Sequence, residues 1–262
     1  EFIGEKKEQV TVRHLLTHCA GLVPFRLYFK EKSSAGEILQ PILNEPLEYP
    51  TGSKTSYSDL DFILLGKIVE KLSGVRLDTF CAEQIFRPLR MADTFFLPDS
   101  SVLSRLAPTE FDAWRGRLVH GQVHDENAHA LGGVSGHAGL FSTARDLATF
   151  LQMLLNGGKY DDLQLLQSGT VALFTRRQNL VPGSSRALGW DTADGANSAG
   201  RLMSERAFGH TGYTGTSVWV DPEKEMFVIL LSNRVHPTRA NTKILKFRAL
   251  LHDAIMRAMV SH

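Results

Sequence analysis

The chain has 262 residues, enough to bury a substantial hydrophobic core, and its formal net charge of +1 excludes the strong positive field of a nucleic-acid-binding protein. Hydrophobic residues account for 43% and charged residues for 22%, which is typical of a globular protein, and no apolar run is long enough to span a membrane. We expect Cys19 and Cys81 to be buried free thiols, with a disulfide between them as the alternative.

The first part of the chain is predicted to be mostly helical. Thr11 can cap a short helix, "VRHLLTH", and prolines place a loop over 22–50 around a short helix at about 35–43. Apolar side chains at helical spacing predict a helix from Tyr57 to about Leu72, and another helix is predicted at about 76–86.

The middle of the chain is first irregular and then helical. Residues 92–140 are rich in Gly, His and Asp, which predicts irregular structure. The segment "STARDLATFLQMLLNGG" (142–158) is the clearest helix in the chain, and we expect Ser142 to cap it and the paired glycines to end it. A further helix is predicted over about 168–176.

The last part predicts a small antiparallel sheet followed by a helix. Three strands are expected, formed by about 187–192 with 206–211, by 215–221 and by 226–232, the last two joined by the turn "DPEKE". Three strands are few for such a chain, and their outer edge would need a partner. The final helix, about 240–260, carries apolar residues expected on one side: Ile244, Phe247, Leu250, Leu251, Ile255 and Met259.

This order of elements predicts an α+β fold in which helical and sheet regions are segregated. We expect a single domain over residues 1–262, with a helical lobe at about 11–180 and, at about 181–262, the sheet with the C-terminal helix. No repeat or interdomain linker divides the sequence.

Tyr57 and Asp59 stand at the start of a predicted helix, after the tight polar loop "YPTGSKTS". A Tyr there can project into a cleft, where the positive end of the helix and nearby cations would favour the phenolate, a general base. The alternative is a tyrosine that only packs the helix start, with Asp59 as an N-terminal charge.

A second candidate is His210-Thr211-Gly212 on a predicted strand, followed by Tyr213 and Thr214. His210 could donate hydrogen bonds or move protons near neutral pH, and Thr211 could bind a carboxylate. Gly212 would let a substrate lie against the backbone, and the free N–H of Tyr213 could stabilise an oxyanion. The alternative is a bulged strand with a satisfied histidine.

A third cluster is "VHGQVHDENAHALGGVSGHAG", which contains His120, His124, Asp125, Glu126, His129 and His137. Imidazoles and carboxylates at short spacing can converge on a metal. The segment has no H-E-x-x-H pattern and is too Gly-rich for a helix to hold ligands in register, so we expect no metal here. A loop that lines a site and a set of purely structural polar residues are the remaining interpretations.

Together these segments resemble the serine β-lactamase-like family, which includes class C β-lactamases, D-Ala-D-Ala peptidases and related esterases. Four segments carry the resemblance in order: "VTVRHLLTHCAGL", "YPTGSKTSYSDLDFILLGKIVEKLSG", "GHAGLFSTARDLATFLQMLLNGG" and "FGHTGYTGTSVWVDPEKEMFVILLSNR". Tyr57 then occupies the Tyr of the family's Y-x-N motif, and His210 begins its K-T-G or H-T-G strand. The segments "VHDENAHALGGVSGHAGLFSTA" and "VPGSSRALGWDT" are most similar to serine-hydrolase domains joined to bacterial cell-wall β-N-acetylglucosaminidases.

The sequence departs from the family pattern in two places. Asp59 stands where Asn is usual, so the site keeps an acceptor but gains charge and loses an amide donor, which disfavours β-lactam binding in particular. The family's nucleophile is the Ser of an upstream S-x-x-K motif, but no Ser here has Lys three residues on, and Thr51-Gly-Ser-Lys54 bears Thr.

The resemblance therefore implies that the N-terminal segment with the nucleophile helix and the first strands is missing. The opening residues, "EFIGEKKEQV", lack the apolar region of a signal peptide and enter a helix abruptly. Three explanations remain open: the sequence begins partway through a longer protein, the segment is a separate chain, or the protein is a noncatalytic relative.

The function implied for the intact protein is a serine hydrolase acting by acyl transfer on D-amino-acid peptides, β-lactams or esters, without cofactor or metal. Tyr57 and His210 would be catalytic, and the substrate would contact Asp59, Thr211, Gly212, Tyr213 and Thr214. This chain alone would show little or no turnover. The alternative is a noncatalytic module that binds peptidoglycan peptides or a partner enzyme. The resemblance also favours the cell envelope or periplasm, and fusion to or association with a cell-wall glycosidase.

Overall fold

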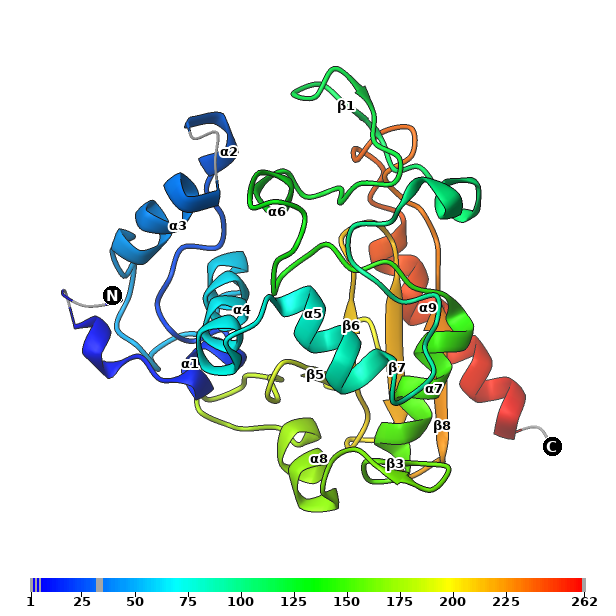
Figure 1. Ribbon diagram of the computed structural model, residues 1–262. Helices are drawn as coiled ribbons and strands as arrows, with labels where there is room; N and C mark the ends of the chain where they lie inside the picture. Colours follow the sequence, from blue (N-terminus) through cyan, green and yellow to red (C-terminus); the bar gives the residue numbers. More distant parts are fainter. Residues whose placement is uncertain (1, 3, 5, 32–34, 261–262) are drawn as a thin grey trace.

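The computed structural model describes residues 2, 4, 6–31 and 35–260. Helices gather around the N-terminal part of the chain, and a four-stranded antiparallel sheet lies toward its C-terminal part (Figure 1). This arrangement confirms the α+β fold predicted from the order of elements. None of the helices in the described part of the chain combines the length and apolar character needed to cross a membrane.

The longer helices lie close to their predicted ranges. The helices are α1 (Val12–Leu16), α2 (Tyr28–Glu31), α3 (Ala35–Asn44), α4 (Asp59–Ser73), α5 (Leu77–Cys81), α6 (Glu126–Ala130), α7 (Ala144–Leu155), α8 (Ser168–Thr175) and α9 (Ile244–Val260). A π-helical turn, Ala82–Phe86, continues α5, and 3-10 turns cover Lys7–Gln9 and Ser100–Arg105. Cys19 and Cys81 are both free thiols, as predicted, the first buried and the second half-buried.

Two helix starts differ from expectation. Thr143, not Ser142, caps α7, because its hydroxyl accepts from the Asp146 N–H, whereas the Ser142 hydroxyl lies 2.8 Å from that of Thr94. The other difference is at α4, which begins at Asp59, so Tyr57 lies in the extended segment before the helix. The predicted cap of α1 by Thr11 is confirmed, and it is completed by the side chain of His14.

Several short elements were not predicted. They are α2, α6, the Ser100–Arg105 turn and two small hairpins, β1 (Phe111–Asp112) with β2 (Arg117–Leu118) and β3 (Lys159–Tyr160) with β4 (Leu163–Gln164). Elements of two to six residues are too short to produce a hydrophobic period.

The main sheet has the strand order β5–β6–β7–β8, with all neighbours antiparallel. The strands are β5 (Asp191–Thr192), β6 (Phe208–Thr211), β7 (Ser217–Asp221) and β8 (Met226–Leu230). The predicted hairpin is confirmed, because Asp221 pairs with Met226 across the turn. The main sheet therefore has four strands where three were expected, because 187–192 and 206–211 contribute two separate strands, β5 and β6, and only the last two residues of 187–192 join the sheet.

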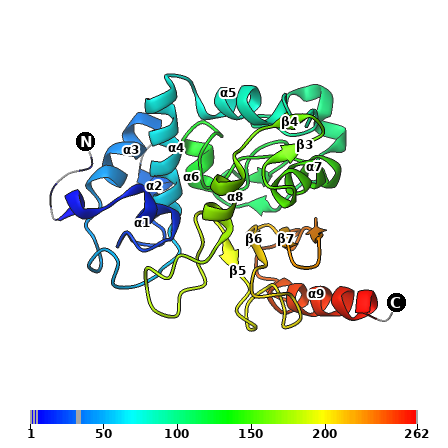
Figure 2. The same cartoon turned by 90° about the horizontal axis from the view of Figure 1, so that it is seen from below.

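Helices cover both faces of the sheet (Figure 2). Phe208, Val218 and Val220 pack on the face that α7 covers, whereas Trp219 and Val228 pack against Met256 of α9 on the other. Alternate residues of a strand point to opposite faces, so this pattern fixes the register of all three long strands. His210, two residues after Phe208, therefore lies on the face that carries α7.

The inner stripe of α9 is not the apolar one that was predicted. Ile244, Arg248, His252 and Met256 are buried at four-residue spacing, while Phe247, Leu250 and Met259 are exposed. The two polar members are bonded inside at some of their nitrogens: the Arg248 guanidinium donates to the carbonyls of Gly212 and Thr216, and His252 Nδ1 lies 2.6 Å from the Ser198 carbonyl. Arg248 Nε and His252 Nε2 have no partner among the described residues, so hydrogen bonding offsets only part of the cost of burying these side chains.

A close backbone approach joins the His-rich loop to α4. A Cβ on Gly136 would lie 2.1 Å from the carbonyl oxygen of Phe62, and one on Gly66 would lie 2.9 Å from the Gly136 nitrogen. Both obstacles are backbone atoms, which cannot rotate away. The absence of side chains at these two positions therefore lets residues 135–137 lie against the first turns of α4.

We expect Gly136→Ala to lower the free energy of unfolding by about 1–3 kcal/mol, because the new methyl group forces the loop away from α4. The matched control is Gly169→Ala in α8, where an added Cβ meets nothing within 4 Å. Urea denaturation followed by circular dichroism measures both. Equal effects of the two substitutions would contradict the close approach.

Candidate active site

Tyr57 lies where the helical region meets the sheet. Ser58 is the N-cap residue of α4, and its hydroxyl donates to the Val23 carbonyl at 2.7 Å, which fixes the chain just after Tyr57. The Tyr57 ring packs on the imidazole of His18, with ring centroids 4.3 Å apart, while the side chain remains 43% exposed. The tyrosine is thus supported from one side and open to solvent on the other.

His210, near the end of β6, faces Tyr57 from the sheet. The two ring centroids are 6.1 Å apart. The guanidinium of Arg186 lies 5.5 Å from the centre of the Tyr57 ring and pairs with Asp191 at 3.3 Å. Tyr57 and His210, which are 153 positions apart in the sequence, are therefore brought together beside a permanent cation.

The surroundings of the site keep both rings neutral, which differs from the phenolate expected for Tyr57. Removal from water, and then the Asp59 carboxylate, raise the pKa of Tyr57 to about 12, and Arg186 only partly opposes them. The predicted preference for phenolate is therefore wrong for this chain, because desolvation outweighs the nearby cation. Burial and then Arg186 hold the pKa of His210 below its usual range, so the imidazole is neutral at pH 7.

The turn after β6 is held from two directions. Arg248 donates to the carbonyls of Gly212 and Thr216, both at 2.7 Å, and Arg234 Nε donates to the Tyr213 carbonyl at 2.7 Å. Within the described residues no acceptor is found for the Tyr213 N–H. Thr211, by contrast, pairs with Ser217 across the ladder and belongs to the opposite face of β6 from His210.

A side chain at Gly212 would meet the Thr216 hydroxyl, since an added Cβ would lie 2.2 Å from Thr216 Oγ1. This glycine therefore lets the turn fold tightly on itself. Thr214 belongs to the same turn, and its carbonyl accepts from the Arg234 N–H at 2.8 Å. Gly212, Tyr213 and Thr214 are thus held in one tight turn by hydrogen bonds from Arg234 and Arg248.

Asp59 lies beside a second carboxylate. Ligand atoms of Asp59, Asp125 and His137 come within 4.8 Å of one another, close enough for a metal ion. However, His137 Nε2 is already bonded to Asp125 at 2.9 Å, and Asp125 also caps α6 by accepting from the Ala128 N–H. These bonds account for the geometry of the pair, and we assign no metal to it. Burial raises the pKa of Asp59 to about 6, with Asp125 adding to this and His137 opposing it.

The His-rich segment lines the region around this site. His124 bonds Glu110 at 2.6 Å and stacks on Tyr213 with ring centroids 5.7 Å apart, while His129 packs on Trp114. Its histidines therefore support two of the site residues, Asp59 and Tyr213. This placement favours the interpretation of the segment as a loop that lines a site.

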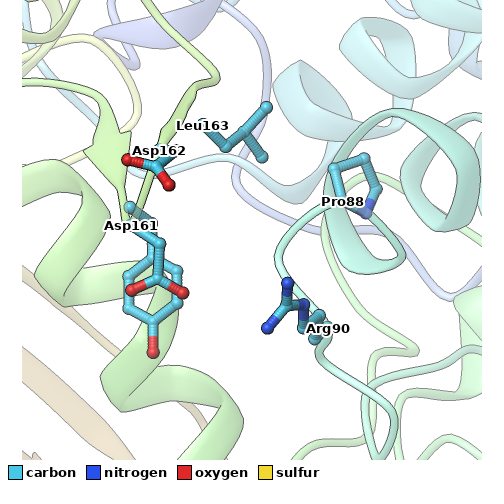
Figure 3. A pocket seen from close by; sticks show the side chains of 6 residues that line it. Pro88, Arg90, Asp161, Asp162 and Leu163 are labelled. Carbon is cyan, nitrogen blue, oxygen red and sulfur yellow. The ribbon is translucent and has the colours of Figure 1, made fainter.

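Sequence reasoning did not name His18 or Arg186 as site residues. Both lie in segments already singled out, "RHLLTH" and "SSRALGWD", but neither segment shows by itself that its side chain reaches Tyr57. A separate pocket lies between Pro88, Arg90 and the β3–β4 hairpin, where Asp161 and Asp162 face it (Figure 3). None of the residues around Tyr57 and His210 lines that pocket, so we do not place the site there.

Comparison with known proteins shows the family to which this chain belongs. The Beta-lactamase family model matches residues 1–253, and the chain therefore belongs to the Beta-lactamase family of serine hydrolases. Proteins from Salmonella typhi and Salmonella schwarzengrund with the provisional name D-alanyl-D-alanine carboxypeptidase are 37% identical over 263 aligned residues, covering 91% of this chain. The chain spans 60% of the length of these relatives.

Solved structures share the fold at low sequence identity. A penicillin-binding protein homologue from Caulobacter crescentus matches 97% of this chain and 73% of its own, with a TM-score of 0.69 and 20% identity. Simvastatin synthase from Aspergillus terreus matches 95% and 69%, with a TM-score of 0.69 and 21% identity. EstCE1, a hydrolase with promiscuous acyltransferase activity, matches 92% and 71%, with a TM-score of 0.66 and 21% identity. These likenesses confirm the predicted β-lactamase/transpeptidase-like fold.

We expect Arg186→Gln to raise the pKa of both His210 and Tyr57, because the Arg186 charge lowers both. NMR titration of the His210 ring and ultraviolet titration of the tyrosines measure the two shifts. Arg206→Gln is the control, since Arg206 is exposed and is not among the charges that act on His210. Unchanged titration of His210 in Arg186→Gln would contradict the electrostatic description of the site.

Proposed function

We propose that this chain supplies one wall of a serine-hydrolase active site that works by acyl transfer. The observation that carries the proposal is the approach of the Tyr57 and His210 rings to 6.1 Å between the helical region and the sheet. A phenol and a neutral imidazole beside Arg186 can exchange protons with a reacting hydroxyl and with a leaving group. No serine in the chain is followed by lysine three residues later, so the nucleophile and its lysine would come from outside these 262 residues.

The reaction would proceed in two steps. The serine oxygen attacks the substrate carbonyl and its proton passes through the lysine and Tyr57 to the departing amine or alcohol, which leaves an acyl-enzyme. Water then attacks the same carbonyl, and the serine oxygen is released with its proton restored. The Tyr213 N–H would donate to the oxyanion, and His210 would assist proton movement from β6.

Substrate contacts would come mainly from the turn after β6 and from the start of α4. Thr211 is the last residue of β6 and lies on the face opposite His210, so it would hold a substrate carboxylate only at the end of the strand, with Gly212 and Thr214 shaping the backbone next to it. Asp59 would accept from a substrate N–H but cannot donate as an amide would. This favours D-amino-acid peptides or esters over β-lactams. The proposed setting is the cell envelope, where the chain would be joined to or associated with a cell-wall glycosidase.

A second function stays open, because one observation favours it. With a pKa of about 12, the phenol of Tyr57 keeps its proton at pH 7 and is not a base. A noncatalytic module that binds peptidoglycan peptides or a partner enzyme would use the same neutral donors and acceptors without turnover.

The experiment that separates the two is covalent labelling of the longer protein that contains this chain, with a fluorophosphonate and a fluorescent penicillin. We expect labelling of the longer protein, none of the 262-residue chain alone, and a loss of about 10²-fold or more in Tyr57→Phe. The matched control is Tyr213→Phe, which keeps the backbone N–H and should label at a rate close to the original. The noncatalytic alternative holds if the longer protein takes no label and hydrolyses no ester or D-Ala-D-Ala peptide.

Asp59→Asn restores an amide donor and removes a charge that raises the pKa of Tyr57. We expect the rate of penicillin acylation relative to ester hydrolysis to rise about three- to tenfold in the longer protein, the worth of one added hydrogen bond. Asp93→Asn, which removes an exposed carboxylate that pairs with Arg105, is the control. An unchanged ratio would show that position 59 does not select the substrate.

A further inference from the structure

Asp61, in the first turn of α4, is a buried carboxyl group that the proposed chemistry does not use. Its side chain is 1% exposed and contacts the equally buried ring of His18, with Oδ2 and Nδ1 3.0 Å apart. A histidine and an aspartate at this distance would ordinarily be described as an ion pair. The hydrogen bonds around them exclude that description.

The backbone of Ser58 provides a donor to His18 Nδ1, the nitrogen that contacts Asp61. The backbone N–H of Ser58 points at His18 Nδ1 at 3.2 Å, so Nδ1 offers its one lone pair and carries no proton, and any donor on Asp61 Oδ2, at 3.0 Å, shares that lone pair in a bifurcated hydrogen bond. The contact between Nδ1 and Asp61 Oδ2 then needs a proton from the other side. A carboxylate has none to give, whereas a carboxylic acid does.

The other carboxyl oxygen of Asp61, Oδ1, also favours the neutral acid. Asp61 Oδ1 is buried and has no hydrogen-bond partner in the described part of the chain. A buried anionic oxygen without any donor is far more costly than the carbonyl oxygen of a neutral acid. Both oxygens are therefore explained if Oδ2 carries the proton and Oδ1 does not.

We propose that Asp61 is a neutral carboxylic acid that donates a hydrogen bond to His18 Nδ1, and that it thereby acts as a positioning residue for Tyr57. The link to Tyr57 is the stacked His18 ring, which also packs on Phe62 with centroids 5.0 Å apart. The protonation state stands on hydrogen-bond geometry alone. The positioning role rests on the function proposed above for Tyr57.

The surrounding charges favour the same neutral pair. Burial, followed by Asp59, raises the pKa of Asp61 to about 8, and burial, Arg186 and His210 lower that of His18 to about 2. The titratable and charged groups that act on this pair, or feel it, are Cys19, Tyr49, Tyr57, Asp59, Arg186 and His210. The positive charge of Arg186 disfavours a protonated His18. The negative charge of Asp59 disfavours an ionised Asp61.

The raised pKa of Asp61 sets the direction in which the stability of the folded protein changes with pH. The folded protein holds the Asp61 proton up to about pH 8, whereas the unfolded chain loses it near pH 4. Between these values the folded state binds more protons, so the contribution of Asp61 to stability falls as pH rises and is level above about pH 8. An ion pair would instead lower the pKa of Asp61, so the contribution of Asp61 to stability would rise with pH below about pH 4 and be level above it.

The test is Asp61→Asn, whose amide donates to Nδ1 as the acid does but does not titrate. We expect its melting temperature to be close to that of the original chain at pH 5 and at least about 2–4 °C above it at pH 8. Asp61→Leu, similar in size but without a donor, should melt lower than Asp61→Asn at both pH values. Asp61→Asn less stable than the original chain at pH 8 would overturn the proposal.

Nitrogen-15 NMR of the unaltered chain provides the direct measurement. At pH 6 we expect the His18 tautomer with the proton on Nε2 and an acceptor shift at Nδ1, and a proton on Nδ1 would overturn the assignment. For the positioning role, fluorophosphonate labelling of the longer protein should be kept in Asp61→Asn and fall about tenfold in Asp61→Leu below its melting temperature. Equal rates in the two variants would overturn that role. Absence of label from the unaltered longer protein would instead refute the proposed function and leave the NMR result valid.

Discussion

The burial of the central sheet on both faces is the constraint on which the rest of the structure depends. Trp219 is fully buried on the side of α9, and its neighbours Val218 and Val220 pack toward α7. A shift of one residue would exchange these faces and expose the largest side chain of the core. The same register carries His210 to the face of α7, because it follows Phe208 by two residues. The histidine proposed to assist proton transfer is thus placed by packing that has no chemical role of its own.

The position of Tyr57 has a different origin. It precedes α4 by two residues, in a segment held by Ser58 and supported by the His18 ring. His18 itself stands at the end of the α1 region with a positive φ of 54°, and its carbonyl accepts from the Ser56 N–H at 2.8 Å. The helical region therefore supports Tyr57 through two of its own residues, Ser58 and His18. The site forms where this support meets the sheet, with the Arg186–Asp191 ion pair beside the Tyr57 ring and acting on His210.

These origins explain what the sequence could and could not predict. The long helices, the β7–β8 hairpin and the pair of Tyr57 with His210 could be predicted, because periodicity and motif order are local or follow from the resemblance. The phenolate state of Tyr57 could not, since it depends on how many groups surround the phenol in three dimensions. The inner stripe of α9 was also unpredictable from periodicity, because buried Arg248 and His252 are tolerated only through carbonyls of distant segments. Short elements such as α6 leave no periodic signal, although the Asp125 cap of α6 is visible in the sequence.

Most of the titratable groups around Tyr57 share one property that bears on mechanism. Burial pushes Tyr57 and Asp61 toward their protonated forms and His18 and His210 toward their unprotonated forms, so these four groups tend to be neutral, whereas Asp59, with a pKa of about 6, is mostly ionised at pH 7. Arg186 remains as a permanent cation beside them. Such a site can bind and orient a carbonyl compound, but within the described residues it has no strong base at pH 7. An additional ammonium group near Tyr57 would lower the pKa of the phenol by direct charge interaction. The missing base and the missing nucleophile of the proposed hydrolase would therefore be supplied together, by one serine and one lysine brought next to a tyrosine that is already in place.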